Sequence, residues 1–361
     1  MEHKLSQLPK ALICLVFTLV AIGIVVLYSA ADGSFSPWAL KQLLLFCFAS
    51  FLSVIIALLH PRRLYQMAYG AYFACFSLLV AVELLGYTSM GATRWLTIFS
   101  IKLQPSELAK FAIVLMLARY FHESTLDSLS SWRTFCVPAV AVLLMCGLII
   151  KQPDLGTGII TLITAGMIFL VAPIQISKIM SVIFGALCLM PIAWNFLYEY
   201  QKKRVAIFFN PEQDPLGSGY NIIQSKIAIG SGGLFGKGFL QGSQSHLSFL
   251  PEHQTDFIFA FLSEEFGFLG GSVVIVLFGL LLASIIDISI KCKSVFLRLT
   301  AQGIAGLIFC HVFVNIAMVM GSLPAVGVPL PFISYGGTMM VSIMIGLGLV
   351  MNAHVHRNFR L

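Results

Sequence analysis

Long apolar runs follow one another along almost the whole chain of 361 residues, which restricts it to folds that a lipid bilayer can hold. A helix that crosses the hydrocarbon core needs about 17–25 predominantly apolar residues. Inside hydrocarbon the backbone polar groups must be paired, and a helix pairs them within one segment. The sequence therefore predicts an all-α polytopic membrane protein of about ten transmembrane helices, near residues 10–30, 39–59, 66–86, 105–121, 135–151, 156–172, 176–196, 255–286, 298–320 and 336–353.

The composition excludes a soluble enzyme. Hydrophobic residues make up 58% of the chain and charged residues 10%, whereas soluble domains contain about 25% charged residues. Residues 196–255 form the one long hydrophilic stretch, and no linker divides the rest. We therefore expect a single domain over residues 1–361, with a large loop at 196–255, and a reaction that takes place at the membrane.

The basic residues predict an orientation, because cytoplasmic loops carry an excess of Lys and Arg. With the N-terminus inside, the inner side holds Lys4, Lys10, Arg62, Arg63, Arg119, Arg133, Lys178, Lys291, Lys293, Arg298, Arg357 and Arg360. The short outer segments hold Lys41, Arg94, Lys102, Lys110 and Lys151. This asymmetry predicts both termini in the cytoplasm and the loop 196–255 outside the cytoplasmic membrane.

Asp256 is the first candidate for chemistry, because it stands where the hydrophilic loop enters an apolar segment. Ionisable groups at such depth are costly and are functional candidates by default. On a helix starting near Thr255, Glu264 lies about 80° around from Asp256 and Glu265 about 180°. A single leading carboxylate suits a general base and not an ordinary glycosidase, which uses two. The alternative is that Asp256 only caps its helix.

Other polar residues flank the predicted spans. Glu107 and Lys110 are three residues apart, so they share a helix face; they form either an internal ion pair or, with Arg94, a site for a phosphate head group. Asp154 either caps the helix that starts near Gly156 or binds a cation or a basic residue.

Residues 321–337 contain three prolines and four glycines and no charge, so they cannot form a regular span. We expect a re-entrant loop that lines a cavity, with Ser334 as a polar contact. His311 and Asn315, four apart on the preceding helix, are expected to form interhelical hydrogen bonds. Residues 219–229 have the pattern of an amphipathic helix, whereas the glycines at 230–238 depart from the phosphate-binding Walker pattern and indicate a flexible or re-entrant loop.

Four motifs occur in one order along the chain: Gln104-Pro-Ser-Glu-Leu-x-Lys110, Gln152-Pro-Asp-Leu-Gly-Thr157, Pro251-Glu-x-x-Thr-Asp-Phe-Ile-Phe-Ala260 and Pro329-Leu-Pro-Phe-Ile-Ser-Tyr-Gly-Gly337. Together they resemble the shape, elongation, division and sporulation (SEDS) family. The segment 219–245 is most similar to the RodA-type elongation members, and the FtsW-type division members are the nearest alternative. One departure concerns Gln254, which stands where the family usually has histidine.

The resemblance implies a peptidoglycan glycosyltransferase that polymerises the disaccharide-pentapeptide lipid precursor, lipid II, on the outer membrane face during cell elongation and shape maintenance. It implies that Asp256 is the essential aspartate. It also implies a class B penicillin-binding transpeptidase and the elongation complex as partners, with no nucleic acid.

Joined to the residue-level argument, this gives a mechanistic hypothesis. Asp256 deprotonates a sugar 4-hydroxyl that attacks an activated donor with inversion, so the polyprenyl diphosphate leaves. Arg94 and Lys110 stabilise the diphosphate, Glu107 orients Lys110, and a divalent cation such as Mg²⁺ is a candidate cofactor. Asp154, Glu264 and Ser334 are further polar candidates. A flippase for the lipid-linked precursor is the main alternative, and an inactive scaffold is a third.

Overall fold

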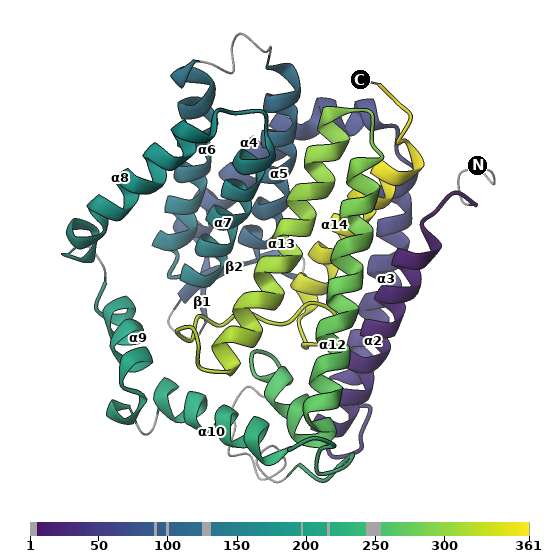
Figure 1. Ribbon diagram of the computed structural model, residues 1–361, viewed down its shortest axis with the longest axis vertical. Helices are drawn as coiled ribbons and strands as arrows, with labels where there is room; N and C mark the ends of the chain where they lie inside the picture. The colour runs from purple at the N-terminus through teal and green to yellow at the C-terminus, as the bar shows by residue number, and fades with distance from the viewer. Residues whose placement is uncertain are drawn as a thin grey trace.

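The computed structural model describes residues 6–89, 92–98, 101–124, 131–195, 198–214, 217–242 and 254–360, and it is a bundle of long helices (Figure 1). Each predicted apolar run contains one helix, which confirms the all-α polytopic membrane fold. The helices are α2 (Lys10–Ala30), α3 (Ala39–Leu58), α4 (Pro61–Leu85), α5 (Pro105–Glu123), α6 (Trp132–Lys151), α7 (Leu155–Val171), α8 (Ile176–Asn195), α12 (Ile258–Ile290), α13 (Val295–Val319) and α14 (Gly337–Val355).

The exact number of membrane spans stays a prediction. In the part of the chain that the structure describes, seven helices are long and apolar enough to cross a membrane. Of the other three, α7 is shorter, the apolar part of α8 is shorter, and α5 carries four charged side chains: Glu107, Lys110, Arg119 and Glu123.

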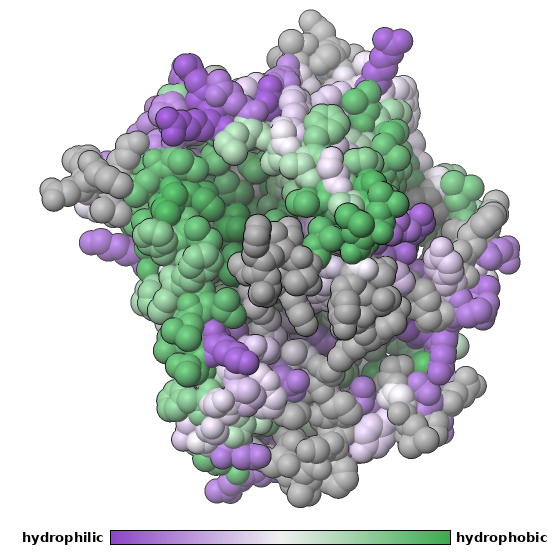
Figure 2. Space-filling view, turned by 180° about the vertical axis from the view of Figure 1, so that it is seen from behind, coloured by the Kyte–Doolittle hydropathy of each residue, from purple (hydrophilic) through white to green (hydrophobic). Residues whose placement is uncertain are grey.

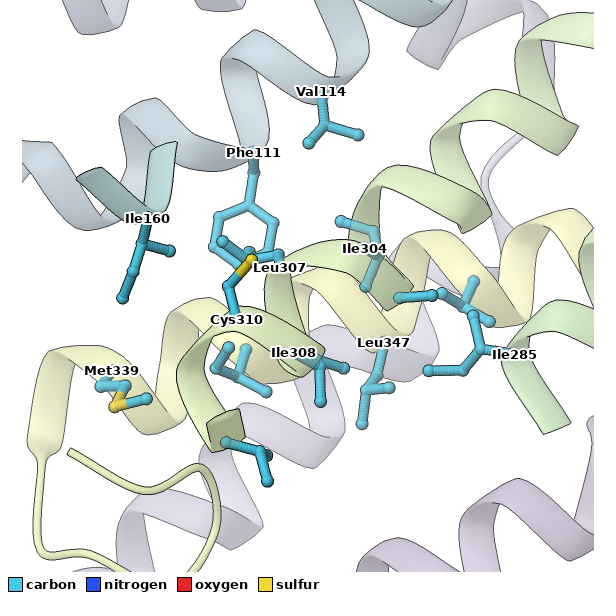
Figure 3. Close-up of a cluster of buried hydrophobic side chains, with 14 of the residues drawn as sticks. Phe111, Val114, Ile160, Ile285, Ile304, Leu307, Ile308, Cys310, Met339 and Leu347 are labelled. Carbon is cyan, nitrogen blue, oxygen red and sulfur yellow. The ribbon is translucent and has the colours of Figure 1, made fainter. Parts of the chain in front are cut away.

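Helix α13 lies at the centre of the bundle and packs against α5, α7, α12 and α14. It is apolar on all sides, which is the pattern of a buried helix. Its side chains Ile304, Leu307 and Ile308 meet Phe111 of α5 and Leu347 of α14 in a continuous hydrophobic cluster (Figure 3). On the outside, hydrophobic surface lies between two zones rich in hydrophilic residues (Figure 2), as a membrane protein requires.

The described parts of the hydrophilic segment 196–255 contain helices. They include α9 (Glu199–Phe209), a 3₁₀ turn at Pro211–Gln213 and α10 (Ser218–Ser231). The last confirms the predicted amphipathic helix. These elements lie at the end of the bundle opposite to the two chain termini (Figure 1).

A small antiparallel sheet between α4 and α5 was not predicted. Its strands are β1 (Tyr87–Ser89), β2 (Ala92–Ile98) and β3 (Ile101–Leu103), paired in the order β1-β2-β3. Thr, Trp and Ile favour strands, but these strands are too short for their pattern to stand out beside the long apolar helices.

The start of α12 differs from the expected one. The helix begins at Ile258, not near Thr255, and its backbone breaks at Gly267, where φ is 65° and ψ is −163°. The loop 232–242 fills this break: the backbone N–H of Lys237 donates to Glu264 O (3.0 Å) and that of Gly238 donates to Glu265 O (3.1 Å). The break thus leaves carbonyl groups of α12 unpaired within the helix, and the glycine-rich loop satisfies them.

Candidate functional site

Asp256 lies in the turn 254–257 that leads into α12, with its side chain partly exposed. Phe257 and not Asp256 occupies the cap position of α12, so capping does not explain this carboxylate. The residues 251–253 of the same motif lie outside the described part of the chain. Asp256 also lines a cavity.

A cavity of about 350 Å³ with several charged lining residues joins Asp256 to the segment 199–221. Its lining comes from α9, the residue after the 3₁₀ turn, α10, the turn before α12, the end of α13 and the loop 321–336: Lys203, Arg204, Ile207, Asp214, Asn221, Asp256, Phe257, Met318, Ala325 and Gly327. The prediction that the proline-rich loop lines a cavity is confirmed through Ala325 and Gly327.

Two cationic side chains of α9 face this cavity, and the sequence did not reveal them. The ammonium of Lys203 lies 3.5 Å from a carboxylate oxygen of Asp214, and the Arg204 guanidinium donates to Ala325 O at 2.9 Å. In the sequence they are ordinary basic residues of a long loop, where charge carries little topological information. Both residues are far from Asp256 in the sequence, and only the folded chain brings all three to the same cavity.

Lys110 has protein partners inside the bundle. Its ammonium is fully buried and lies 2.8 Å from Glu107 Oε1 and 2.9 Å from His311 Nε2. The other oxygen of Glu107 accepts a hydrogen bond from the Ser342 hydroxyl at 3.0 Å. The internal ion pair is thus present, the interhelical bond predicted for His311 is confirmed, and a direct contact of Lys110 with a diphosphate stays a prediction.

We expect Lys110→Met to destabilise the protein by about 3–5 kcal/mol, because the buried Glu107 carboxylate would lose its ionic partner. The double variant Lys110→Met/Glu107→Gln should recover much of this loss. Thermal unfolding of the purified protein in detergent measures both. As the matched control, Lys291→Met removes an exposed partner of Asp287 and should cost under about 1 kcal/mol. A double variant no more stable than Lys110→Met would contradict the ion-pair account.

Two interpretations were open for Asp154: a cap of the helix that follows it, or a group that binds a cation or orients a basic residue. The structure contradicts the first. Asp154 stands before α7, but no capping bond from its side chain is found among the described residues. Its carboxylate instead accepts hydrogen bonds from Gln104 Nε2 and from the Ser106 hydroxyl, both at 3.0 Å. The side chain thus joins the start of α7 to the start of α5 and links two of the sequence motifs.

The remaining predicted site residues, Glu264, Ser334 and Arg94, are not among the residues that line the cavity described above. Glu264 is buried and its carboxylate lies 2.6 Å from the Lys237 ammonium. Ser334 is buried and hydrogen-bonds to Thr255 O and to the Leu330 N–H. The backbone of Arg94 lies in β2, and its side chain is outside the described part of the chain. Their contact with a substrate stays a prediction.

The lining of the cavity is compatible with a divalent cation brought by a phosphate ligand. In the described ranges no three His, Cys, Asp or Glu side chains gather into a metal cage. Two carboxylates, Asp214 and Asp256, line the same cavity. Mg²⁺ is commonly held by one or two carboxylates together with substrate phosphates, so this donor set fits such an ion.

Fold and site together define a polytopic membrane protein in which two acids and two cations line one cavity at one end of a helical bundle. The family model of FtsW, RodA and SpoVE cell cycle proteins matches residues 10–359. The chain therefore belongs to this family, as its four motifs indicated.

Similar sequences include the peptidoglycan glycosyltransferase MrdB of Escherichia coli K12, which is 43% identical over 305 residues, covering 84% of this chain and 82% of the relative. MrdB of Helicobacter pylori strain 26695 is 38% identical over 318 residues, covering 87% and 82%. Stage V sporulation protein E of Bacillus subtilis is 36% identical over 367 residues, covering 98% of both chains.

Solved structures show the same fold. One, described as "Structural coordination of polymerization and crosslinking by a peptidoglycan synthase complex", has a TM-score of 0.84 and 30% identity over 97% of this chain and 98% of that chain. The rod shape determining protein RodA of Thermus thermophilus has a TM-score of 0.73 and 28% identity, with 98% of both chains covered.

Proposed function

We propose that this chain is a peptidoglycan glycosyltransferase that polymerises lipid II into glycan strands during cell elongation. The observation that carries the proposal is the cavity that places the Asp256 carboxylate with the Lys203 and Arg204 cations. A base and two cations match the needs of a transfer from a diphosphate ester. The relatives named peptidoglycan glycosyltransferase support the reaction class, and those named MrdB support elongation over division.

In the proposed reaction Asp256 accepts the proton of a sugar 4-hydroxyl of the acceptor. The oxygen attacks the anomeric carbon of the donor from the face opposite to the diphosphate. The bond between that carbon and the diphosphate oxygen breaks, and polyprenyl diphosphate leaves with both electrons of the bond. The configuration at the anomeric carbon is inverted.

Charge develops on the leaving diphosphate, and the cations of α9 oppose it. Arg204 suits phosphate oxygens because its guanidinium binds them through two parallel hydrogen bonds, whereas Lys203 acts as a point charge. A divalent cation such as Mg²⁺ would add positive charge at the same group, with Asp214 as its protein ligand. Arg94 is proposed as a further cation for the diphosphate.

The proposed location is the cytoplasmic membrane, with both termini in the cytoplasm and the cavity outside. The excess of Lys and Arg in the segments assigned to the inner side supports it. The proposed partner is a class B penicillin-binding transpeptidase, as the similarity to a structure of a peptidoglycan synthase complex suggests.

The purified chain, alone and with its transpeptidase, is to be incubated with lipid II, and the products separated by gel electrophoresis. We expect glycan strands. A parallel assay follows a fluorescent precursor across proteoliposome membranes. Movement of the precursor without strand formation would overturn the polymerase and establish the flippase. Inactivity of both the chain and its complex in both assays would favour the scaffold.

A further inference from the structure

The turn that contains Asp256 is hydrogen-bonded to the central helix α13 through the buried side-chain amide of Asn315. Asn315 of α13 is fully buried, and its Nδ2 donates to Asp256 O at 2.8 Å and to Val328 O at 2.6 Å. One side chain therefore ties the turn 254–257 and the loop 321–336 to the same position on the central helix.

The loop 321–336 provides the other attachments. The Ser334 hydroxyl donates to Thr255 O at 2.6 Å and accepts from the Leu330 N–H at 2.7 Å. The Tyr335 N–H donates to Gln254 O at 2.9 Å. Three consecutive carbonyl groups, those of Gln254, Thr255 and Asp256, are thus each held from α13 or from this loop.

The carboxylate itself lies close to the loop backbone. At Gly327 φ is +70°, and an added Cβ would lie 3.3 Å from Oδ2 of Asp256. The position of the carboxylate in the cavity therefore depends on how the turn and the loop are joined. A general base must lie within about 2.6–3.2 Å of the proton it accepts, or reach it through one water.

We propose that Asn315 and Ser334 are positioning residues, which join the turn to the loop so that Asp256 faces the acceptor hydroxyl. The inference rests on the proposed function, because it needs Asp256 as the base. Misplacing a reacting group by about 1 Å can cost 10²-fold in rate. Loss of either side chain should lower kcat, whereas KM, governed by the cations and the lipid contacts, should change little.

Asn315→Leu tests this, because leucine has a similar size and lacks both donors. We expect kcat for lipid II polymerisation to fall about 10–100-fold, with KM within about two-fold of wild type. Ser334→Ala should act in the same direction. Ser334→Thr keeps the hydroxyl and should restore kcat, a rescue that a general loss of stability would not produce.

Asn352 provides the matched control at the other end of the bundle. It is also a fully buried asparagine, and its Nδ2 donates to the carbonyl oxygens of Ile56 at 2.9 Å and Leu59 at 2.7 Å. Asn352→Leu should lower the Tm about as much as Asn315→Leu and leave kcat near wild type.

The outcomes separate this inference from the proposed function. Suppose that Asp256→Asn is inactive, while Asn315→Leu keeps the wild-type kcat or loses no more kcat than Asn352→Leu. The positioning role is then overturned, and the proposed polymerase function stands. If Asp256→Asn is fully active, the base itself is wrong. Should Asn315→Leu fail to fold, the pair Ser334→Ala and Ser334→Thr decides: equal kcat values in the two would overturn the inference.

Discussion

Asp256→Asn is expected to lower kcat for lipid II polymerisation by about 10²–10⁴-fold, the usual contribution of a general base. Asparagine has nearly the same shape, so the hydrogen bonds to the backbone of the turn should persist. Its carboxamide is not basic, because the nitrogen lone pair is delocalised into the carbonyl group, so the side chain cannot accept the proton of the attacking hydroxyl. Strand formation by the purified variant at saturating lipid II measures the loss.

The control for this substitution lies on α12, the helix that follows the turn of Asp256. Asp287 of α12 is exposed and pairs with Lys291 on the surface. Asp287→Asn makes the same chemical change far along the helix and should leave kcat within about two-fold of wild type. An Asp256→Asn protein that polymerises at the wild-type rate would refute the role of Asp256 as base.

Arg204→Gln should lower kcat/KM about 10²–10³-fold, the usual cost of removing one donor that stabilises transition-state charge. The guanidinium lies in the cavity with Asp256, where it would face the leaving diphosphate. Arg204→Lys keeps the charge but loses the two parallel hydrogen bonds, so an intermediate activity is expected. Steady-state kinetics with lipid II measure all three proteins.

Lys202 is the matched control for Arg204. It belongs to the same helix and pairs with Glu199 at 3.2 Å, and it is absent from the cavity lining described above. Lys202→Gln removes one positive charge from α9 and should change kcat/KM by less than about three-fold. If Lys202→Gln and Arg204→Gln were equally impaired, the overall charge of α9 and not the cavity would account for the effect.

Much of the fold was predictable because membrane insertion depends on the local sequence. A span is determined by the length of its own apolar run, so the helices were expected close to where they lie. The main errors of the sequence-based prediction lie where a loop meets a helix. The start of α12 was placed at Thr255 because its apolar run begins there, but the structure has a turn until Ile258.

Within the site, the sequence identified Asp256 and the pair Glu107–Lys110 because each places charge where apolar residues dominate. It could not choose between an internal ion pair and a ligand site for Lys110, since both predict the same pattern. His311, which completes the surroundings of Lys110, lies on a different helix. Capping by Asp154 was one of its two interpretations because capping is a local interaction, whereas its hydrogen-bond partners, Gln104 and Ser106, lie at the start of α5.

The sequence by itself thus determined the membrane class, the family motifs and the exceptional position of Asp256. Only the tertiary structure decided that Lys203 and Arg204 share a cavity with Asp256 and that Asn315 and Ser334 hold its turn. The physical reason lies in helices such as α13, which are apolar on all sides. Hydropathy shows that such a helix is buried, but the neighbours it meets follow from side-chain packing between segments far apart in the chain.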